Sequence, residues 1–445
     1  MSGQYDFLVI GDDEASLCAA AAAARAGAST AHLRINQRKK QSGAATTPAI
    51  PNFVWRRLEL QDYDLTLEPA SARVTLFKDG DPVITYAKPR ETSAALEETG
   101  IDDHFVWSDF IEETNGLAAN GYLASTLFNA GKDSGKGIAK MLTDPVALER
   151  TARLFGPSAD LLNDYFTDER LKAHVSAHAL GLAGASDREA GSAAALSEFF
   201  DEDSWRARTP KDATNLMTVL EIACQDAGVK SYAGKITEIA NDGAKQIGVS
   251  IGAEDKIRTS YIFFATPEAA AAAGALQGDG RPGLNNTAHA SITVRFKLSN
   301  RIEPPAGDDK AIFQIIDDLE DVRDARDAAV RGKLHERAPV EFEYTPNGEI
   351  VARTAYFPAA FFEDGAWRGW TGQDRQAAAA IIKNRIASRL PDFASQIRRA
   401  ETEVMTPNTR ESFFEGCDRV IVQWRRHNAI SAAVKLIDEV MARSE

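Results

Sequence analysis

The residues with the clearest chemical potential form a short turn near the N-terminus. The run Gly11-Asp12-Asp13-Glu14-Ala15-Ser16 follows an apolar stretch and precedes a helix-forming one. A dinucleotide-binding turn has GxGxxG at such a place: the first glycine makes the turn, the second admits the pyrophosphate, and the third lets the helix pack on the strand. Here Gly11 supplies the first glycine, whereas Asp13 and Ser16 stand at the second and third positions.

The acidic residues of this turn oppose a phosphate group. Two like unit charges about 4 Å apart repel by about 1 kcal/mol in water and about 4 kcal/mol at an effective dielectric constant of about 20. Asp13, with Asp12 and Glu14 beside it, therefore disfavours a pyrophosphate. The alternative role of these carboxylates is structural, because acids at a helix N-terminus cap its N–H groups and stabilise its dipole.

The second strand ends in Arg34, where a dinucleotide site needs an acid for the ribose hydroxyls. An arginine accepts no hydrogen bonds, so it cannot replace that acid. It can pair with the 2′-phosphate of NADP, and the basic run 38–40 follows closely. NADP is therefore one alternative, and a solvated basic loop is the other.

Three further patterns each lack a part that their chemistry requires. Gly131 to Gly137 resembles a phosphate loop without its first glycine and final Ser or Thr, and we expect a flexible loop there. His174 and His178 have the i,i+4 spacing of metal ligands, but no third ligand can be identified, so we predict no metal site. We expect both residues to lie on a helix surface or in a second domain. Ser192 lacks the GxSxG elbow of a hydrolase nucleophile.

The elements that must position the turn form a strand–helix–strand unit. We predict a strand over Phe7–Ile10, a helix over Glu14–Ala26 and a strand over Thr30–Leu33. A helix between two strands makes them parallel. Gly27 stands where helices commonly end, and the alanines at 19–24 let the helix lie close to a sheet.

The rest of the chain predicts a helix with a meander, a second β-rich region, and a final strand and helix. Apolar and polar residues alternate over 292–296 and 340–344, which predicts an antiparallel sheet with one covered face. The predicted elements are the helix 215–227, the strands 235–239, 248–251 and 261–265, the helix 374–390, the strand 420–424 and the helix 429–442.

Composition narrows the class of protein. The length of 445 residues favours two or three domains, and 44% apolar with 26% charged residues is globular composition. The net charge of −14 argues against nucleic acid, and against anionic lipid bound by charge alone. Cys18, Cys224 and Cys417 are too scattered for a disulfide framework or a cysteine zinc site, so we expect a reducing, cytoplasmic location. We expect no signal peptide and no transmembrane segment, while peripheral membrane contact stays open.

Several segments in order along the chain resemble the flavin amine oxidase superfamily, and most closely its phytoene desaturase-like branch. The resemblance implies an FAD-type Rossmann domain, with a parallel sheet and a β-meander, built from 1–60, 205–287 and 405–445. It implies an α+β substrate-type domain built from 61–204 and 288–404, with an apolar ligand. The segments that carry it are Gly11, Ser42–Thr46, Arg73–Phe77 with Asp79-Gly80, Asp168–Leu171, Gly191–Leu196, Tyr261–Pro267 (ending FFATP) and Thr406–Asn408.

The resemblance also implies where a cofactor would bind, and these positions are altered here. The glycine-rich loop of the family's last strand–helix connection is replaced by 425–428, Arg-Arg-His-Asn. These residues would hold an anion at a helix N-terminus, or pair with Asp12, Asp13 and Glu14 in an internal salt-bridge cluster. The vestigial or altered cofactor positions are Gly11, Asp12, Asp13, Ser16, Arg34, Gly43, Ala44, Ile236, Thr266, Arg425 and Arg426.

We therefore predict a pseudoenzyme with no catalytic residue and no bound cofactor, or FAD if the ancestral site is still used. Its predicted role is to bind an apolar ligand or a protein partner. One alternative is an active FAD- or NADP-dependent oxidoreductase on an isoprenoid-like substrate, and another is a scaffold subunit of a larger assembly. Aromatic residues of the second domain could line an apolar pocket: Phe105, Trp107, Phe110, Phe199, Phe200, Tyr356, Phe357, Phe361, Phe362, Trp367 and Trp370.

Overall fold

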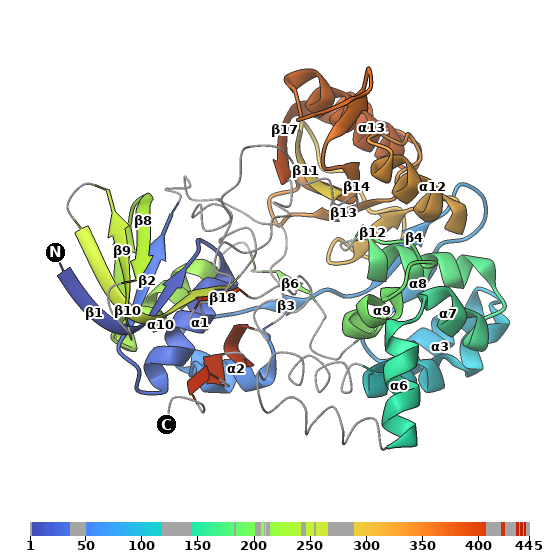
Figure 1. Cartoon of the computed structure of the whole chain (residues 1–445). Coiled ribbons are helices and arrows are strands. Elements are labelled where there is room, and N and C mark those ends of the chain that lie inside the picture. The colour runs from blue at the N-terminus through green and yellow to red at the C-terminus, as the bar shows by residue number, and fades with distance from the viewer. Residues whose placement is uncertain are drawn as a thin grey trace. The chain divides into compact units, whose positions relative to one another are not determined.

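The chain forms two compact units in a computed structural model, and each is described by itself (Figure 1). Unit 1 contains Met1–Glu68, Arg206–Asn286 and Pro407–Glu445, and unit 2 contains Pro69–Trp205 and Thr287–Thr406. The structure describes residues 2–35, 50–117, 144–181, 184–200, 206–208, 210, 214–241, 246–252, 255–265, 289–405, 420–422, 433–435, 437–438 and 440–441.

Unit 1 begins with the predicted strand–helix–strand unit. Strand β1 (Ser2–Ile10) leads through Gly11 into helix α1 (Glu14–Arg25), and β2 (Thr30–Arg34) follows. Helix α1 ends before Gly27, whose φ of 95° lies in the left-handed region that favours glycine. Both strands run parallel, as predicted.

A mixed sheet forms the framework of unit 1, in the order β7-β2-β1-β10-β9-β8, with β18 also paired to β10. Strand β10 runs from Asp255 to Phe264, so it is longer than the predicted 261–265. Its first half pairs antiparallel with β9, and its second half pairs parallel with β18. This one strand therefore joins the meander to the parallel sheet. The other strands are β7 (Lys230–Ala233), β8 (Ile236–Asn241), β9 (Ile247–Ile251) and β18 (Val420–Val422).

Alternate residues of β1 belong to two separate apolar clusters. Phe7 and Val9 pack with the alanine face of α1 and with α10 (Leu216–Asp226), whereas Leu8 and Ile10 pack with the meander strands. The sheet is therefore covered on both faces, which explains why its central strands are apolar throughout. Unit 1 also contains α2 (Asn52–Arg57) and the short η1 (Leu60–Asp62), and its described residues 433–435, 437–438 and 440–441 are helical too.

Unit 2 contains a second sheet, in the order β17-β11-β14-β13-β12-β4-β5. Only β12 and β4 pair in parallel among its described strands. The prediction of one covered face is wrong for β13, because all five of its residues are buried. Arg353 on β14 pairs with both Glu341 and Glu343 of β13, so these acids are neutralised inside the unit. The strands are β4 (Arg73–Leu76), β5 (Val83–Thr85), β11 (His289–Leu298), β12 (Ile312–Ile315), β13 (Val340–Tyr344), β14 (Ile350–Pro358) and β17 (Ile397–Met405).

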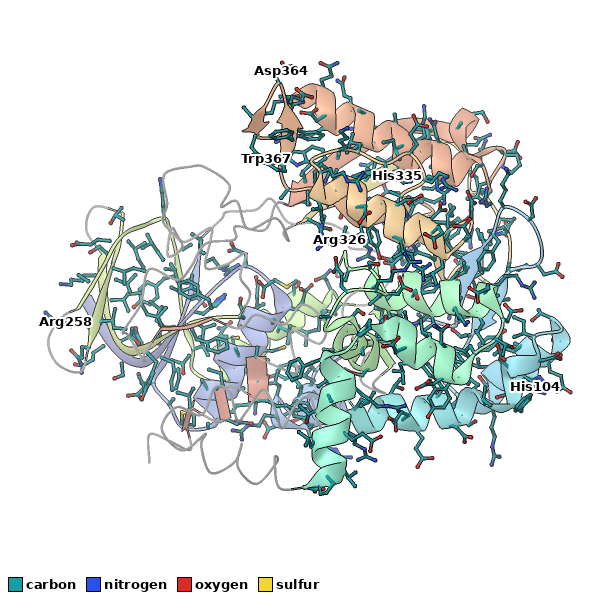
Figure 2. All side chains as sticks on the ribbon, turned by 45° about the vertical axis from the view of Figure 1, so that its right-hand side comes forward. His104, Arg258, Arg326, His335, Asp364 and Trp367 are labelled. Atoms are coloured by element: carbon teal, nitrogen blue, oxygen red, sulfur yellow. The ribbon has the colours of Figure 1, made fainter. Side chains whose placement is uncertain are left out.

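Helices and a small hairpin complete unit 2. Figure 2 shows Asp364 at the tip of the hairpin formed by β15 (Phe361–Glu363) and β16 (Ala366–Arg368), which pair antiparallel. Within the described residues, no helix has the length and apolar character to cross a membrane. Residues 107–117 are also helical. The other helices are α3 (Pro89–Glu98), η2 (Asp102–Phe105), α6 (Pro145–Phe155), α7 (Ser158–Tyr165), α8 (Glu169–Leu180), α9 (Ser192–Phe200), α12 (Leu319–Val330), α13 (Gly372–Ala387) and α14 (Phe393–Gln396). Strand β6 (Ala207–Arg208) belongs to unit 1 and pairs with β3 (Glu68–Pro69), whose Glu68 ends the first segment of that unit.

Candidate functional site

The turn between β1 and α1 is the candidate site that the sequence singles out. Gly11 adopts a φ of 154°, and its N–H donates to the carbonyl oxygen of Leu33 at 3.1 Å. This bond ties the turn to the end of β2, the strand beside β1. The carboxyl ends of two adjacent parallel strands thus meet at the N-terminus of α1, where α/β folds of this kind bind their ligands.

Asp13 caps helix α1 with its own side chain. Its Oδ1 accepts hydrogen bonds from the backbone N–H of Ser16 at 2.8 Å and from the hydroxyl of Ser16 at 2.9 Å. Both Asp13 and Ser16 belong to the altered cofactor positions, so the structure brings these two together. The capping role that the sequence left open is the one that Asp13 has here.

A second acid increases the negative charge of this turn. Glu14 is half-buried in the first turn of α1. Burial raises the pKa of Glu14, and the charge of Asp13 adds to the rise. The same burial and the same Asp13 charge that raise the pKa of Glu14 also oppose another anion at this place.

His32 is a site residue that the sequence reasoning missed. It is 1% exposed, and its Nε2 lies 2.9 Å from the carbonyl oxygen of Gly11, so the imidazole N–H donates a hydrogen bond to that carbonyl. Burial lowers the pKa of His32 to about 4, and the charge of Arg34 adds to this. A signal for this role was the position of His32 within β2. It pairs with Val9 of β1, so its side chain lies on the face of the sheet that the helices cover.

Arg34 forms an ion pair within the chain. Its Nη1 lies 2.8 Å from Oε1 of Glu221 on α10, and both side chains are a little over 40% exposed. The residue at the ribose position therefore neutralises an acid of the neighbouring helix. Ile236 begins β8 and is buried among the meander residues, where it contributes to the apolar core of unit 1.

Asp12 lies in the turn itself and is half-buried, whereas the other five altered cofactor positions lie outside the described residues, as do residues 425–427 of the proposed salt-bridge cluster. The loop 131–137 lies outside them as well. The positions concerned are Gly43, Ala44, Thr266, Arg425 and Arg426.

The described residues of the turn do not fit the pyrophosphate of FAD. A pyrophosphate at a helix N-terminus accepts hydrogen bonds from the first backbone N–H groups. Here the Asp13 carboxylate accepts the bond from Ser16 N–H and adds a negative charge at the same end of α1. We therefore derive no chemical step through a flavin at this site.

The two histidines of α8 are buried in unit 2, so of the two places predicted for them, a helix surface or the second domain, the surface is wrong. His174 makes hydrogen bonds with the hydroxyls of Thr75 at 2.7 Å (Nδ1) and Thr85 at 2.9 Å (Nε2). The rings of His174 and His178 lie 4.7 Å apart. Both nitrogens of His174 are engaged, and in the described part of the chain no three His, Cys, Asp or Glu side chains gather as metal ligands.

The aromatic residues of unit 2 divide between core and hairpin. Tyr356 is buried, and its hydroxyl donates a hydrogen bond to the carbonyl oxygen of Ala185 at 3.0 Å. Phe362 and Trp367 pair across the hairpin strands with ring centroids 5.2 Å apart. Phe105, by contrast, is 71% exposed. These contacts are those of packing residues, and the apolar pocket stays a prediction.

Known proteins share the fold of this chain but not its sequence. No protein-family model and no curated protein matches it. Putrescine oxidase bound to putrescine matches over 100% of both chains, with 12% identity and a TM-score of 0.53. RAB GDI from Plasmodium falciparum matches over 99% of this chain and 98% of its own, with 7% identity and a TM-score of 0.55. The chain therefore shares the fold of putrescine oxidase and of RAB GDI, and this agrees with the fold class that the sequence resemblance predicted.

Proposed function

We propose that this protein is a non-catalytic member of its fold class that binds a partner and takes no dinucleotide at the turn after β1. The observation that carries this proposal is the cap on α1. The Asp13 carboxylate accepts the hydrogen bond from Ser16 N–H that a phosphate would need, at 2.8 Å. Because Ser16 N–H already has a hydrogen-bond partner, a phosphate would gain no bond from it. The phosphate would also be repelled by the negative charge of Asp13.

The neighbouring contacts support the same proposal. Arg34, which would reach a 2′-phosphate, is paired with Glu221. His32 secures the turn through the Gly11 carbonyl without any ligand. The turn is thus held by its own side chains, whereas a cofactor site is commonly completed by its cofactor.

A protein is the partner that we favour, with an apolar small molecule as the alternative. The likeness to RAB GDI, whose name refers to a Rab protein, supports a protein partner on this fold. The likeness to putrescine oxidase supports the competing function, an active FAD- or NADP-dependent oxidoreductase of phytoene desaturase type. Fold alone does not separate them, because function depends on the site.

Cofactor binding by the purified full-length chain separates these functions. We expect a colourless protein whose melting temperature does not change with FAD or NADP. A cofactor present at about 100 times its Kd would stabilise the folded state by about 2.7 kcal/mol, which a melting curve detects easily. A yellow protein, or a melting temperature raised by either cofactor, overturns the proposal.

Two substitutions of Asp13 test whether its side chain excludes the cofactor. Asp13→Gly removes the side chain from the turn, and we expect it to respond to FAD more than the wild type does. Asp13→Asn keeps a capping side chain and removes only the charge. Its response to FAD, compared with that of Asp13→Gly, therefore measures how much of the cofactor exclusion is due to the charge of Asp13. If the wild type is unresponsive and Asp13→Gly is unresponsive too, Asp13 is not the residue that excludes the cofactor.

A further inference from the structure

Strand β17 leaves one edge of the unit 2 sheet open among the described strands. It pairs with β11 on one side, and it stands at the end of the strand order. At nine residues it is the longest of the terminal strands of the two large sheets, since β5, β7 and β8 have three, four and six residues. An open strand edge carries backbone N–H and C=O groups that can pair with another strand.

The side chains of β17 carry opposite charges on one face of the strand. Arg399, Glu401 and Glu403 alternate with Ala400 and Thr402, so the charged residues share a face. Arg399 is 69% exposed and Glu401 is 44% exposed, and Arg399 Nε lies 3.1 Å from Glu401 Oε1. These charges therefore lie at the surface, in reach of a strand that pairs beside β17.

We propose that β17 pairs antiparallel with β17 of a second copy of this chain, about a two-fold axis at Ala400. In this register, Arg399 lies opposite Glu401 of the partner subunit, and Glu401 lies opposite Arg399 of the partner subunit. Directly opposite residues of antiparallel strands interact most strongly, so both ion pairs form at once. The two small Ala400 side chains meet at the axis on the opposite face of the sheet, so they do not crowd the ion pairs.

The charge pattern selects this register over its neighbours. A two-fold axis perpendicular to the sheet passes through a residue position, because opposite residues must lie on the same face. An axis at Arg398 or Arg399 places that arginine against itself, and an axis at Glu401 does the same for the acid. An axis at Thr402 places Glu401 against Glu403 of the partner subunit. An axis at Glu401 also sets Arg399 against Glu403 of the partner subunit, but it brings the two Glu401 side chains together. Ala400 is the one centre from 398 to 402 that sets opposite charges against each other without setting like charges together.

The competing explanation is that the charges keep the edge unpaired, since charged residues on edge strands commonly prevent association. A same-sign row would serve that purpose best, whereas Arg399 and Glu401 are self-complementary. Charge reversal separates the two explanations. If the charges only prevent pairing, the wild type is a monomer and reversal leaves it a monomer.

The experiment measures the dimer dissociation constant of the full-length chain by sedimentation velocity over a range of concentrations. We expect a dimer for the wild type. Arg399→Glu and Glu401→Arg each convert two ion pairs into two repulsive pairs, so each should raise the dissociation constant at least about tenfold. The double variant Arg399→Glu/Glu401→Arg exchanges the partners and should restore the dimer to within about threefold of the wild type.

Arg398→Glu is the matched control. It makes the same change of charge on the same strand, but Arg398 lies on the opposite face and across from Thr402 of the partner subunit. We expect it to leave the dissociation constant within about threefold of the wild type. Because Glu401 also lies 3.8 Å from Lys297, the melting temperature of each variant shows that the strand itself is intact.

Three outcomes would overturn the proposal. The first is a wild type that stays monomeric at every concentration. The second is a dimer that both single reversals leave unchanged, which would place the interface elsewhere. The third is hydrogen exchange in which the β17 amides are equally protected at low and high concentration, which would mean that this chain itself covers the edge.

Discussion

His32 holds the turn after β1 through a single hydrogen bond, from its Nε2–H to the carbonyl of Gly11 at 2.9 Å. The residue is neutral in the folded protein, because burial lowers its pKa to about 4 from an ordinary value of 6.5. A buried imidazole that resists protonation makes folding sensitive to acid. Between these two pKa values the unfolded chain binds a proton that the folded chain does not bind.

This difference predicts a loss of stability as the pH falls from 6.5 toward 4. Between pH 7 and pH 5, we expect the wild type to lose about 2 kcal/mol more unfolding free energy than His32→Gln, which keeps a donor but does not titrate. Urea unfolding of both proteins at the two pH values measures the difference. Equal losses for the two proteins would show that His32 keeps an ordinary pKa.

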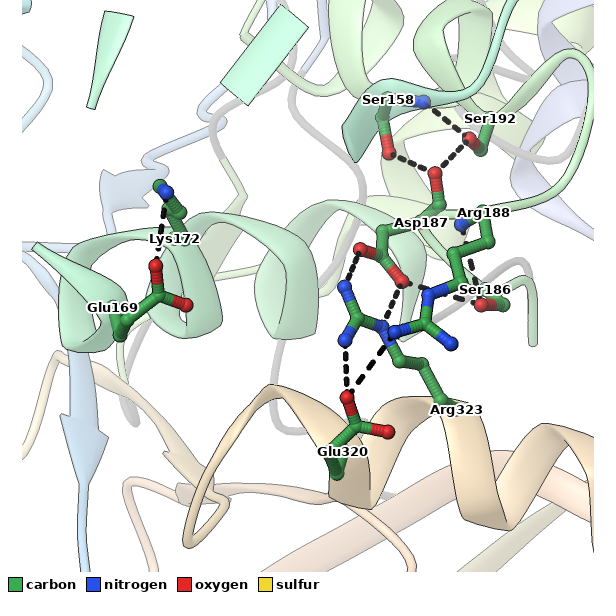
Figure 3. Close-up of polar contacts among 9 residues, drawn as sticks. All are labelled: Ser158, Glu169, Lys172, Ser186, Asp187, Arg188, Ser192, Glu320 and Arg323. Carbon is green, nitrogen blue, oxygen red and sulfur yellow. Dashed lines mark hydrogen bonds and ion pairs between the residues drawn. The ribbon is translucent and has the colours of Figure 1, made fainter. Parts of the chain in front are cut away.

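At the scale of elements, Asp187 links three helices of unit 2 (Figure 3). Its buried carboxylate accepts two hydrogen bonds from Arg323 of α12, at 3.0 Å from Nε and 2.7 Å from Nη2. Its backbone carbonyl accepts from Ser192 Oγ of α9 at 3.1 Å and from Ser158 Oγ of α7 at 3.4 Å. Arg323 also pairs with Glu320, which is 52% exposed. One arginine thus contacts one buried and one exposed acid.

This arrangement provides a matched pair of variants. Asp187→Ala leaves the Arg323 guanidinium without its buried partner, and we expect a loss of about 3 kcal/mol in unfolding free energy. Glu320→Ala removes a solvated partner of the same arginine, and we expect a change of no more than about 0.5 kcal/mol. Denaturant unfolding of both variants provides the comparison. Similar losses would mean that burial of Asp187 does not set the strength of its pair.

At the scale of the whole molecule, each apolar core draws its described residues from one unit. The cluster that contains Val9 belongs to unit 1, and the cluster that contains Phe342 belongs to unit 2. Separate cores commonly unfold as separate cooperative transitions. The division of the chain is therefore expected to appear in calorimetry.

We expect two thermal transitions for the full-length chain. Val9→Ala should lower one of them and Phe342→Leu the other, each by about 4–8 °C, because each removes buried apolar volume from one core. Differential scanning calorimetry of the two variants and the wild type tests this. A single transition that both variants lower equally would indicate that the two units unfold together.

The elements of unit 1 were largely predictable because local signals agree with the fold. A capping residue, an alanine-rich stretch and a glycine stop define α1 within a residue of its observed end. The length of β10 was not predictable, because its first half is largely polar and becomes a strand by pairing with both β9 and β1. The burial of Glu341 and Glu343 could not be predicted either, since it depends on Arg353 of another strand.

The sequence by itself determined the altered turn, because a missing glycine is a local property, and the resemblance of its segments to a known family indicated the fold class. It also identified Asp13 as the residue in conflict with a phosphate. Only the tertiary structure decided what that carboxylate does, since its role depends on its distance to Ser16 N–H. Tertiary structure also brought His32 to Gly11 and Glu221 to Arg34, across 21 and 187 residues of chain. Such contacts arise from strand register and helix packing, which a single sequence does not encode locally.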